Sequence, residues 1–219
     1  ITADTGIDVL THAYEAYVSS KANDFTDAAA EKSMKLVFEY LPEAYKAAGK
    51  NIEELTKEDL YARQKMHHAS CLAGMAFSNA GLGINHSMAH TLGGHFHIPH
   101  GRANAVLLPY VMAYNCGCRT SLTPVAERYA KMSTVLSLDS GSSRQSAFGA
   151  IRATKQLIRK LNIPSCIKNL GIPENEFVAA LDEMVDAAMA DSCTATNPRV
   201  PTREELKELF MEAYRGREI

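Results

Sequence analysis

Apolar residues recur at helical spacing along most of the chain. Within residues 5–19, Ile7, Leu10, Tyr14 and Val18 form a single apolar stripe, which predicts a first helix. The same pattern predicts further helices over residues 24–48, 56–79, 102–115, 123–136, 146–161 and 174–190, with a last one opening at a capping box over residues 202–205. With one short helix around His86 and His90, the pattern predicts about nine helices.

The chain lacks the pattern of a dinucleotide-binding strand and loop. No β-branched run precedes a glycine-rich segment, and Gly81-Leu-Gly83 has no third glycine. Residues 102–115 are apolar nearly all round, so we expect that helix at the centre of the core. Pro42 and Pro109 fall inside predicted helices. Pro42 is expected to kink its helix or mark a second one, and Pro109 is expected to kink its helix. The sequence therefore predicts an all-α domain.

The composition argues against nucleic acid and a membrane as partners. The 219 residues are 46% hydrophobic and carry a formal charge of −2, with no basic block for nucleic acid and no apolar run long enough for a membrane span. Five cysteines, an odd number, do not form a disulfide framework, so we expect a reducing cytoplasm. Cys116-Gly-Cys118 has neither the usual two-residue gap nor a second pair, so we interpret it as small packed thiols.

Histidines are concentrated in residues 81–101, which hold five of the chain's eight. Neutral imidazole is the commonest metal ligand near neutral pH. His86 and His90 are four residues apart and share a helix face. His100 follows Gly93-Gly94 and Pro99, and is expected to start a new element. His95 and His97 are expected in the intervening loop as solvated or hydrogen-bonded side chains.

A second candidate pair, Asp8 and His12, is four apart on the first helix. That spacing allows a carboxylate and an imidazole to hold one cation, but it also fits an ordinary surface pair. The adjacent His67 and His68 point in different directions and are interpreted as non-ligands.

Three stretches resemble the signature regions of the iron-containing (group III) alcohol dehydrogenases. They are ADTGIDVLTHAYE at residues 3–15, HSMAHTLGG at residues 86–94 continuing to PHGRAN at 99–104, and CTATNPR at 193–199. The resemblance covers residues 1–219 and implies the C-terminal helical, metal-binding catalytic domain of the dehydroquinate synthase-like fold. It implies that the Rossmann-like NAD(P)-binding domain is absent from this chain. Asn85 departs from the small or apolar residue that relatives usually carry.

The resemblance implies a ligand set of Asp8, His12, His86 and His100. One carboxylate and three imidazoles suit iron(II) or zinc(II), and iron is the usual metal of the family. By the same resemblance, His90 is the catalytic histidine near the nicotinamide and the alcohol.

Phe77 and Cys193 match positions that line the substrate or nicotinamide pocket, although a core aromatic and a buried thiol explain them equally well. The implied function is oxidation of a small alcohol to an aldehyde or ketone, with hydride transfer to NAD or NADP in a homo-oligomeric full-length enzyme.

Two alternatives remain open at this stage. In the first alternative, the chain is a helical metal-binding or assembly module without its own activity. A metal-dependent hydrolase would need a general base beside the metal, and Glu15, three residues after His12, is the candidate. We expect Glu15 to support a ligand instead.

Overall fold

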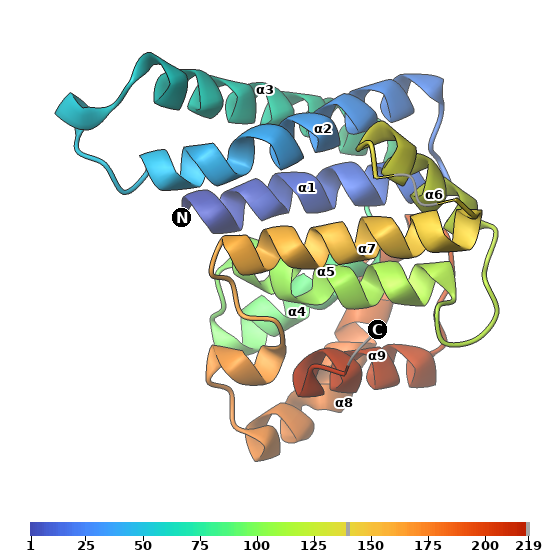
Figure 1. The fold of residues 1–219 in the computed structure, drawn as a ribbon. Helices are drawn as coiled ribbons and strands as arrows, with labels where there is room; N and C mark the ends of the chain where they lie inside the picture. Colours follow the sequence, from blue (N-terminus) through green and yellow to red (C-terminus); the bar gives the residue numbers. More distant parts are fainter. Residues whose placement is uncertain (139–140, 218–219) are drawn as a thin grey trace.

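The computed structural model describes residues 1–138 and 141–217, and these ranges contain nine α-helices, three short 3₁₀ helices and no strand (Figure 1). The all-α prediction is confirmed. The α-helices are α1 (Thr2–Val18), α2 (Asp24–Ala47), α3 (Lys57–Ala80), α4 (Ile84–Phe96), α5 (His100–Cys116), α6 (Val125–Val135), α7 (Ser143–Lys160), α8 (Glu174–Ala190) and α9 (Arg203–Arg215). The 3₁₀ helices are η1 (Ile52–Glu54), η2 (Ile167–Leu170) and η3 (Ser192–Thr196).

Helices α1 and α5 occupy the middle of the molecule. In Figure 1, α2 and α3 pair on one side of α1, while α4, α5 and α7 lie on its other side, and α8 and α9 close the far end. Thirteen of the seventeen residues of α5 are buried, which explains why its sequence is apolar all round and confirms its predicted central position. Residues on α1 and α5 therefore face each other inside the bundle.

The segment from α4 to α5 differs from the prediction. Helix α4 continues through Gly93 and Gly94 to Phe96, so the expected break at the glycine pair is wrong and His95 is helical. The carbonyl oxygen of Ile98 lies 3.1 Å from where a Cβ of Gly93 would stand, so the missing side chain makes room for the returning chain. His97 ends the helix in the left-handed region at φ 53°.

Helix α5 begins at His100, two residues before the predicted start, and it continues through Pro109 as one helix. Helix α2 likewise continues through Pro42, so no second helix begins there. All five cysteines lie in the described ranges and none forms a disulfide. Among the described helices we find no candidate for a membrane-spanning segment.

Candidate metal centre

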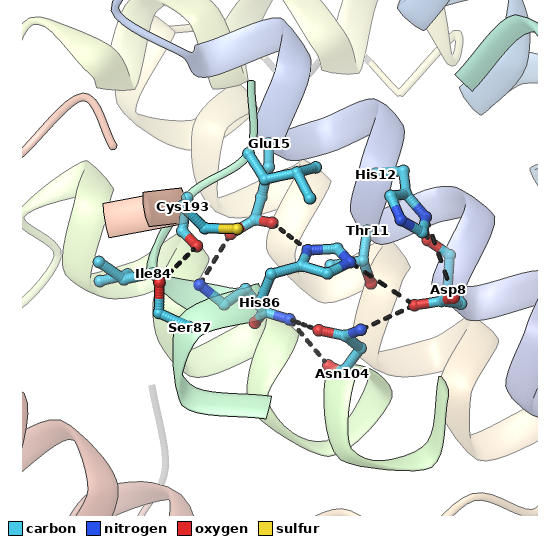
Figure 2. A network of polar contacts seen from close by, with 12 residues as sticks. Asp8, Thr11, His12, Glu15, Ile84, His86, Ser87, Asn104 and Cys193 are labelled. Carbon is cyan, nitrogen blue, oxygen red and sulfur yellow. Dashed lines mark hydrogen bonds and ion pairs between the residues drawn. The ribbon is translucent and has the colours of Figure 1, made fainter. Parts of the chain in front are cut away.

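His86 is the most buried histidine of residues 81–101, with 1% of its surface exposed. Its Nδ1 hydrogen-bonds Oε2 of the buried Glu15, whose Oε1 accepts the Asn85 N–H at 2.7 Å. The carboxylate acts as acceptor, so Nδ1 carries the hydrogen and Nε2 is left with its lone pair. Figure 2 shows Glu15 and Asp8 approaching the His86 ring from opposite sides.

Asp8 brings α1 and α5 together at this ring. Its Oδ1 lies 3.8 Å from His86 Nε2 and 3.4 Å from His100 Nε2. The amide of Asn104 donates to Asp8 Oδ1 at 2.7 Å (Figure 2). The same amide nitrogen lies 3.0 Å from His100 Nε2. One ligand atom from each of Asp8, His86 and His100 lies within 4.8 Å of the other two. Three helices thus converge on one small polar space.

His12 lies beside this group and is not part of the tight three-atom cluster. Its ring centroid is 4.4 Å from that of His86, and the ring stacks on Phe77 with centroids 4.5 Å apart. Nδ1 of His12 lies 2.7 Å from the Asp8 carbonyl oxygen, so it is the donor and Nε2 is the free nitrogen. The spacing of four residues on α1 places both side chains on the face toward α4 and α5.

The donor set fits a divalent cation. In the described part of the chain, His86 Nε2 is buried without a hydrogen-bond partner, which is costly unless something else binds it. Three imidazoles and one carboxylate are borderline to hard ligands that iron(II) and zinc(II) accept. We conclude that the residues present fit the metal that the resemblance implies.

Electrostatics of the rings agree with a site for a cation. Burial lowers the pKa of His12, with a contribution from His86, and burial lowers the pKa of His100, so both favour the neutral, ligating form. Burial also acts to lower the pKa of His86, but Glu15 and Asp8 outweigh it and raise that pKa. The raised pKa of His86 reports the concentration of negative charge at this point.

His90 occupies the open side of the centre. Its ring is 43% exposed and stacks on His100 with centroids 5.5 Å apart. Its Nδ1 lies 2.8 Å from Oδ2 of Asp191, the residue between α8 and η3. Sequence reasoning missed Asp191; its place two residues before Cys193, just ahead of the resembling segment, was the available signal.

Residues 2–214 match the family model described as "Fe-containing alcohol dehydrogenase family, C-terminal". The chain belongs to the iron-containing alcohol dehydrogenase family. As in the resemblance set out above, the match is to the C-terminal part of these proteins.

Individual members of the iron-containing alcohol dehydrogenase family align along nearly the whole chain. The NADPH-dependent butanol dehydrogenase of Clostridium saccharobutylicum is 43% identical over 219 residues, covering 100% of this chain and 52% of the relative. The 1-propanol dehydrogenase of Salmonella typhimurium is 47% identical over 217 residues, covering 97% of this chain and 54% of the relative. The chain therefore spans about half the length of these curated relatives.

A solved structure of the same family agrees with the fold. The iron-containing alcohol dehydrogenase from Thermococcus thioreducens superposes with a TM-score of 0.84 at 35% identity. The alignment covers 99% of this chain and 51% of that chain. The helical domain thus has the architecture of about half of that iron-containing alcohol dehydrogenase.

The remaining histidines of this family member lie apart from the centre. His67 and His68 are exposed on α3, and His67 lines a separate hollow with residues of α1 and α2. His95 faces Glu183 of α8 with 3.9 Å between Nε2 and Oε1. His97 caps α4. None of the four joins the cluster around His86 in the described part of the chain.

Proposed function

We propose that this chain is the metal-binding half of an NAD(P)-dependent alcohol dehydrogenase. The observation that carries the proposal is the convergence of Asp8, His86 and His100, with His12 adjoining, around the unpartnered Nε2 of a buried histidine. Relatives named as butanol and 1-propanol dehydrogenases support a small alcohol or aldehyde as substrate.

The proposed ligands are Asp8, His12, His86 and His100, with iron(II) as the resident metal and zinc(II) as the alternative. A divalent cation, when bound, supplies a Lewis acid that favours alcohol deprotonation in one direction and carbonyl polarisation in the other. Glu15 holds His86 through Nδ1–H, and Asn104 holds the Asp8 carboxylate. These two contacts fix the directions of the donor atoms before any metal arrives.

His90 is proposed to move the proton. Asp191 accepts the hydrogen bond from Nδ1, which selects the tautomer with an unprotonated Nε2. Because Asp191 ties the ring down beside His100, Nε2 is available to take the alcohol's proton and return it in the reverse reaction. Phe77 and Cys193 are proposed to line the nicotinamide side of the same space.

The hydride acceptor is proposed to be NAD or NADP, held mainly by an N-terminal Rossmann-like domain outside this chain. The Clostridium relative is named as NADPH-dependent. We further propose that the full-length enzyme is a cytoplasmic homo-oligomer.

The two alternatives are less well supported. For a hydrolase, Glu15 would have to be a free general base, yet both of its oxygens are engaged, one by His86 and one by the Asn85 N–H. An assembly module without activity explains the fold but gives no reason for a buried, unpartnered imidazole nitrogen.

The test is metal analysis and alcohol oxidation on the intact protein, with and without a chelator. We expect His86→Ala to lose both metal and activity, and His90→Ala to keep the metal while turnover falls by about 10²-fold or more. His67→Ala, on the exposed side of α3, is the matched control and should change neither. Unchanged metal content in His86→Ala would refute the ligand assignment.

A further inference from the structure

A second group of unlike donor atoms lies next to the proposed centre. One atom each from His90, Asp191 and Cys193 lies within 4.8 Å of the other two, a nitrogen, an oxygen and a sulfur. Within this group, His90 Nδ1 and Asp191 Oδ2 are 2.8 Å apart. None of the three is a proposed ligand of the first centre.

The backbone that carries these donors is fixed in place. Asp191 caps η3 by accepting the Cys193 N–H at 2.8 Å with its Oδ1. Thr194, in the same turn, hydrogen-bonds Ser87 Oγ at 2.8 Å and the Ala188 carbonyl at 2.7 Å, which ties η3 to α4 and α8. The donor atoms therefore do not depend on a mobile loop to come together.

We propose that His90, Asp191 and Cys193 form a second cation site that binds zinc(II) and other borderline-soft divalent ions such as cadmium(II). Imidazole, carboxylate and thiolate are the three donor types that zinc takes in proteins. Three protein ligands, one of them on a ring that is 43% exposed, match zinc sites that keep the fourth position for water. A thiol that coordinates such an ion gives up its proton.

The negative charge around the two sites offsets the repulsion between two neighbouring dications. The carboxylates of Asp8, Glu15 and Asp191 supply three negative charges around two ions. Burial and Asp191 raise the pKa of the Cys193 thiol to about 12, so the thiol adds a fourth charge only when a bound ion displaces its proton. The sites also differ in preference: sulfur is absent from the proposed ligands of the first and present in the second, so the softer ion favours the second.

The other four described thiols, the buried Cys166 among them, join no group of three or more candidate ligand residues. Cys116 and Cys118 are hydrogen-bonded to each other, but the positive charges of Arg144 and Arg119 act on the Cys118 sulfur. Cys71 is exposed on α3. These residues therefore supply the control variants.

Occupancy of the second site has a consequence for turnover, and this step rests on the proposed function. A cation at His90 Nδ1 replaces the hydrogen bond to Asp191 and moves the ring proton to Nε2. With Nε2 protonated, His90 no longer accepts the alcohol's proton. Zinc at the second site would thus inhibit the enzyme without removing the metal of the first.

The test is a titration of the reduced, intact, iron-loaded protein with cadmium chloride. The readout is the ultraviolet thiolate-to-cadmium charge-transfer band, measured with the bound cadmium by elemental analysis. We expect one thiolate band that Cys193→Ser abolishes and Cys118→Ser and Cys71→Ser retain. Asp191→Asn should weaken cadmium binding by about tenfold or more, and zinc should compete for the same site.

A band that survives Cys193→Ser, or one that Cys118→Ser removes, would overturn the second site. Should Cys193→Ser misfold, His90→Ala provides the second variant, and cadmium affinity unchanged by it would also overturn the proposal. Failure of the proposed function is separate: it would show as absent alcohol oxidation in the iron-loaded protein before cadmium is added, while the band is independent of activity.

Discussion

Glu15 determines how His86 is presented, because its two oxygens hold the ring and the start of the helix that carries it. The sequence allowed Glu15 to be expected as support for a ligand, since it lies three residues after His12. It did not reveal that the supported ligand would be His86, 71 residues away. Helical spacing reports neighbours on one helix and is silent on which distant side chain completes a hydrogen bond.

We predict that Glu15→Gln lowers metal affinity by roughly 10–100-fold. Glutamine has one acceptor and one donor group, so it cannot accept from both His86 and the Asn85 N–H, and it removes a buried negative charge. Competition with a metal-binding dye measures the affinity. Glu43→Gln, which changes an exposed ion pair with Lys46 on the surface of α2, is the control. Equal affinities in the two variants would contradict the role of Glu15.

At the scale of elements, the site depends on how closely α1 and α5 approach. The helices themselves were largely predictable, because apolar periodicity and capping residues are local signals; the capping box at residues 202–205 opens α9 as expected. The continuation of α4 through Gly93-Gly94 was not predictable, because packing against α5 and α8 outweighs the low helix propensity of glycine.

We predict that Gly101→Ala destabilises the fold by about 1–3 kcal/mol and weakens metal binding. A Cβ at Gly101 would stand 2.4 Å from the Asp4 carbonyl oxygen, so the backbones that carry Asp8 and His100 must separate. Gly74→Ala on α3 is the matched control, with nothing within 4 Å of its new methyl group. That change should stabilise the helix by about 0.5–1 kcal/mol. Denaturant unfolding measures both, and equal effects would contradict the close-contact argument.

The start of α9 provides a pH-dependent prediction. The pKa of Glu205 is lowered by the Thr202 backbone N–H, against the opposing effect of burial, with help from Tyr114 and Arg199. A depressed folded-state pKa stabilises the fold above the unfolded value of 4.5, and this contribution is lost as pH falls through the folded value. Glutamine also accepts the Thr202 N–H, so Glu205→Gln isolates the charge.

We therefore expect Glu205→Gln to cost from a few tenths to about 1 kcal/mol near neutral pH. The difference from the parent protein should shrink to zero as pH falls below 4.5. Urea unfolding at several pH values measures it, and a difference that persists in acid would mean that Glu205 acts through packing.

At the scale of the whole molecule, the proposed centre and its surroundings are assembled from α1, α4, α5 and the segment before η3. The family resemblance supplied the candidate ligands, whereas Asp191, 101 residues from His90, emerged only when the chain was folded. The distances between these segments are set by the burial of α1 and α5 in one core. Filling the centre should therefore stabilise that core as a unit.

We predict that a chelator lowers the unfolding temperature of the iron-loaded protein. At free metal about 100 times the dissociation constant, binding to the folded state alone contributes about 2.7 kcal/mol. For a unit of this size each kcal/mol shifts the transition by about 2–4 °C, so the expected drop is roughly 5–10 °C. Calorimetry with and without chelator measures the shift. His86→Ala/His100→Ala, which lacks two of the proposed ligands, should melt at one temperature under both conditions. A chelator effect of equal size in that variant would place the stabilising metal outside the cluster around His86.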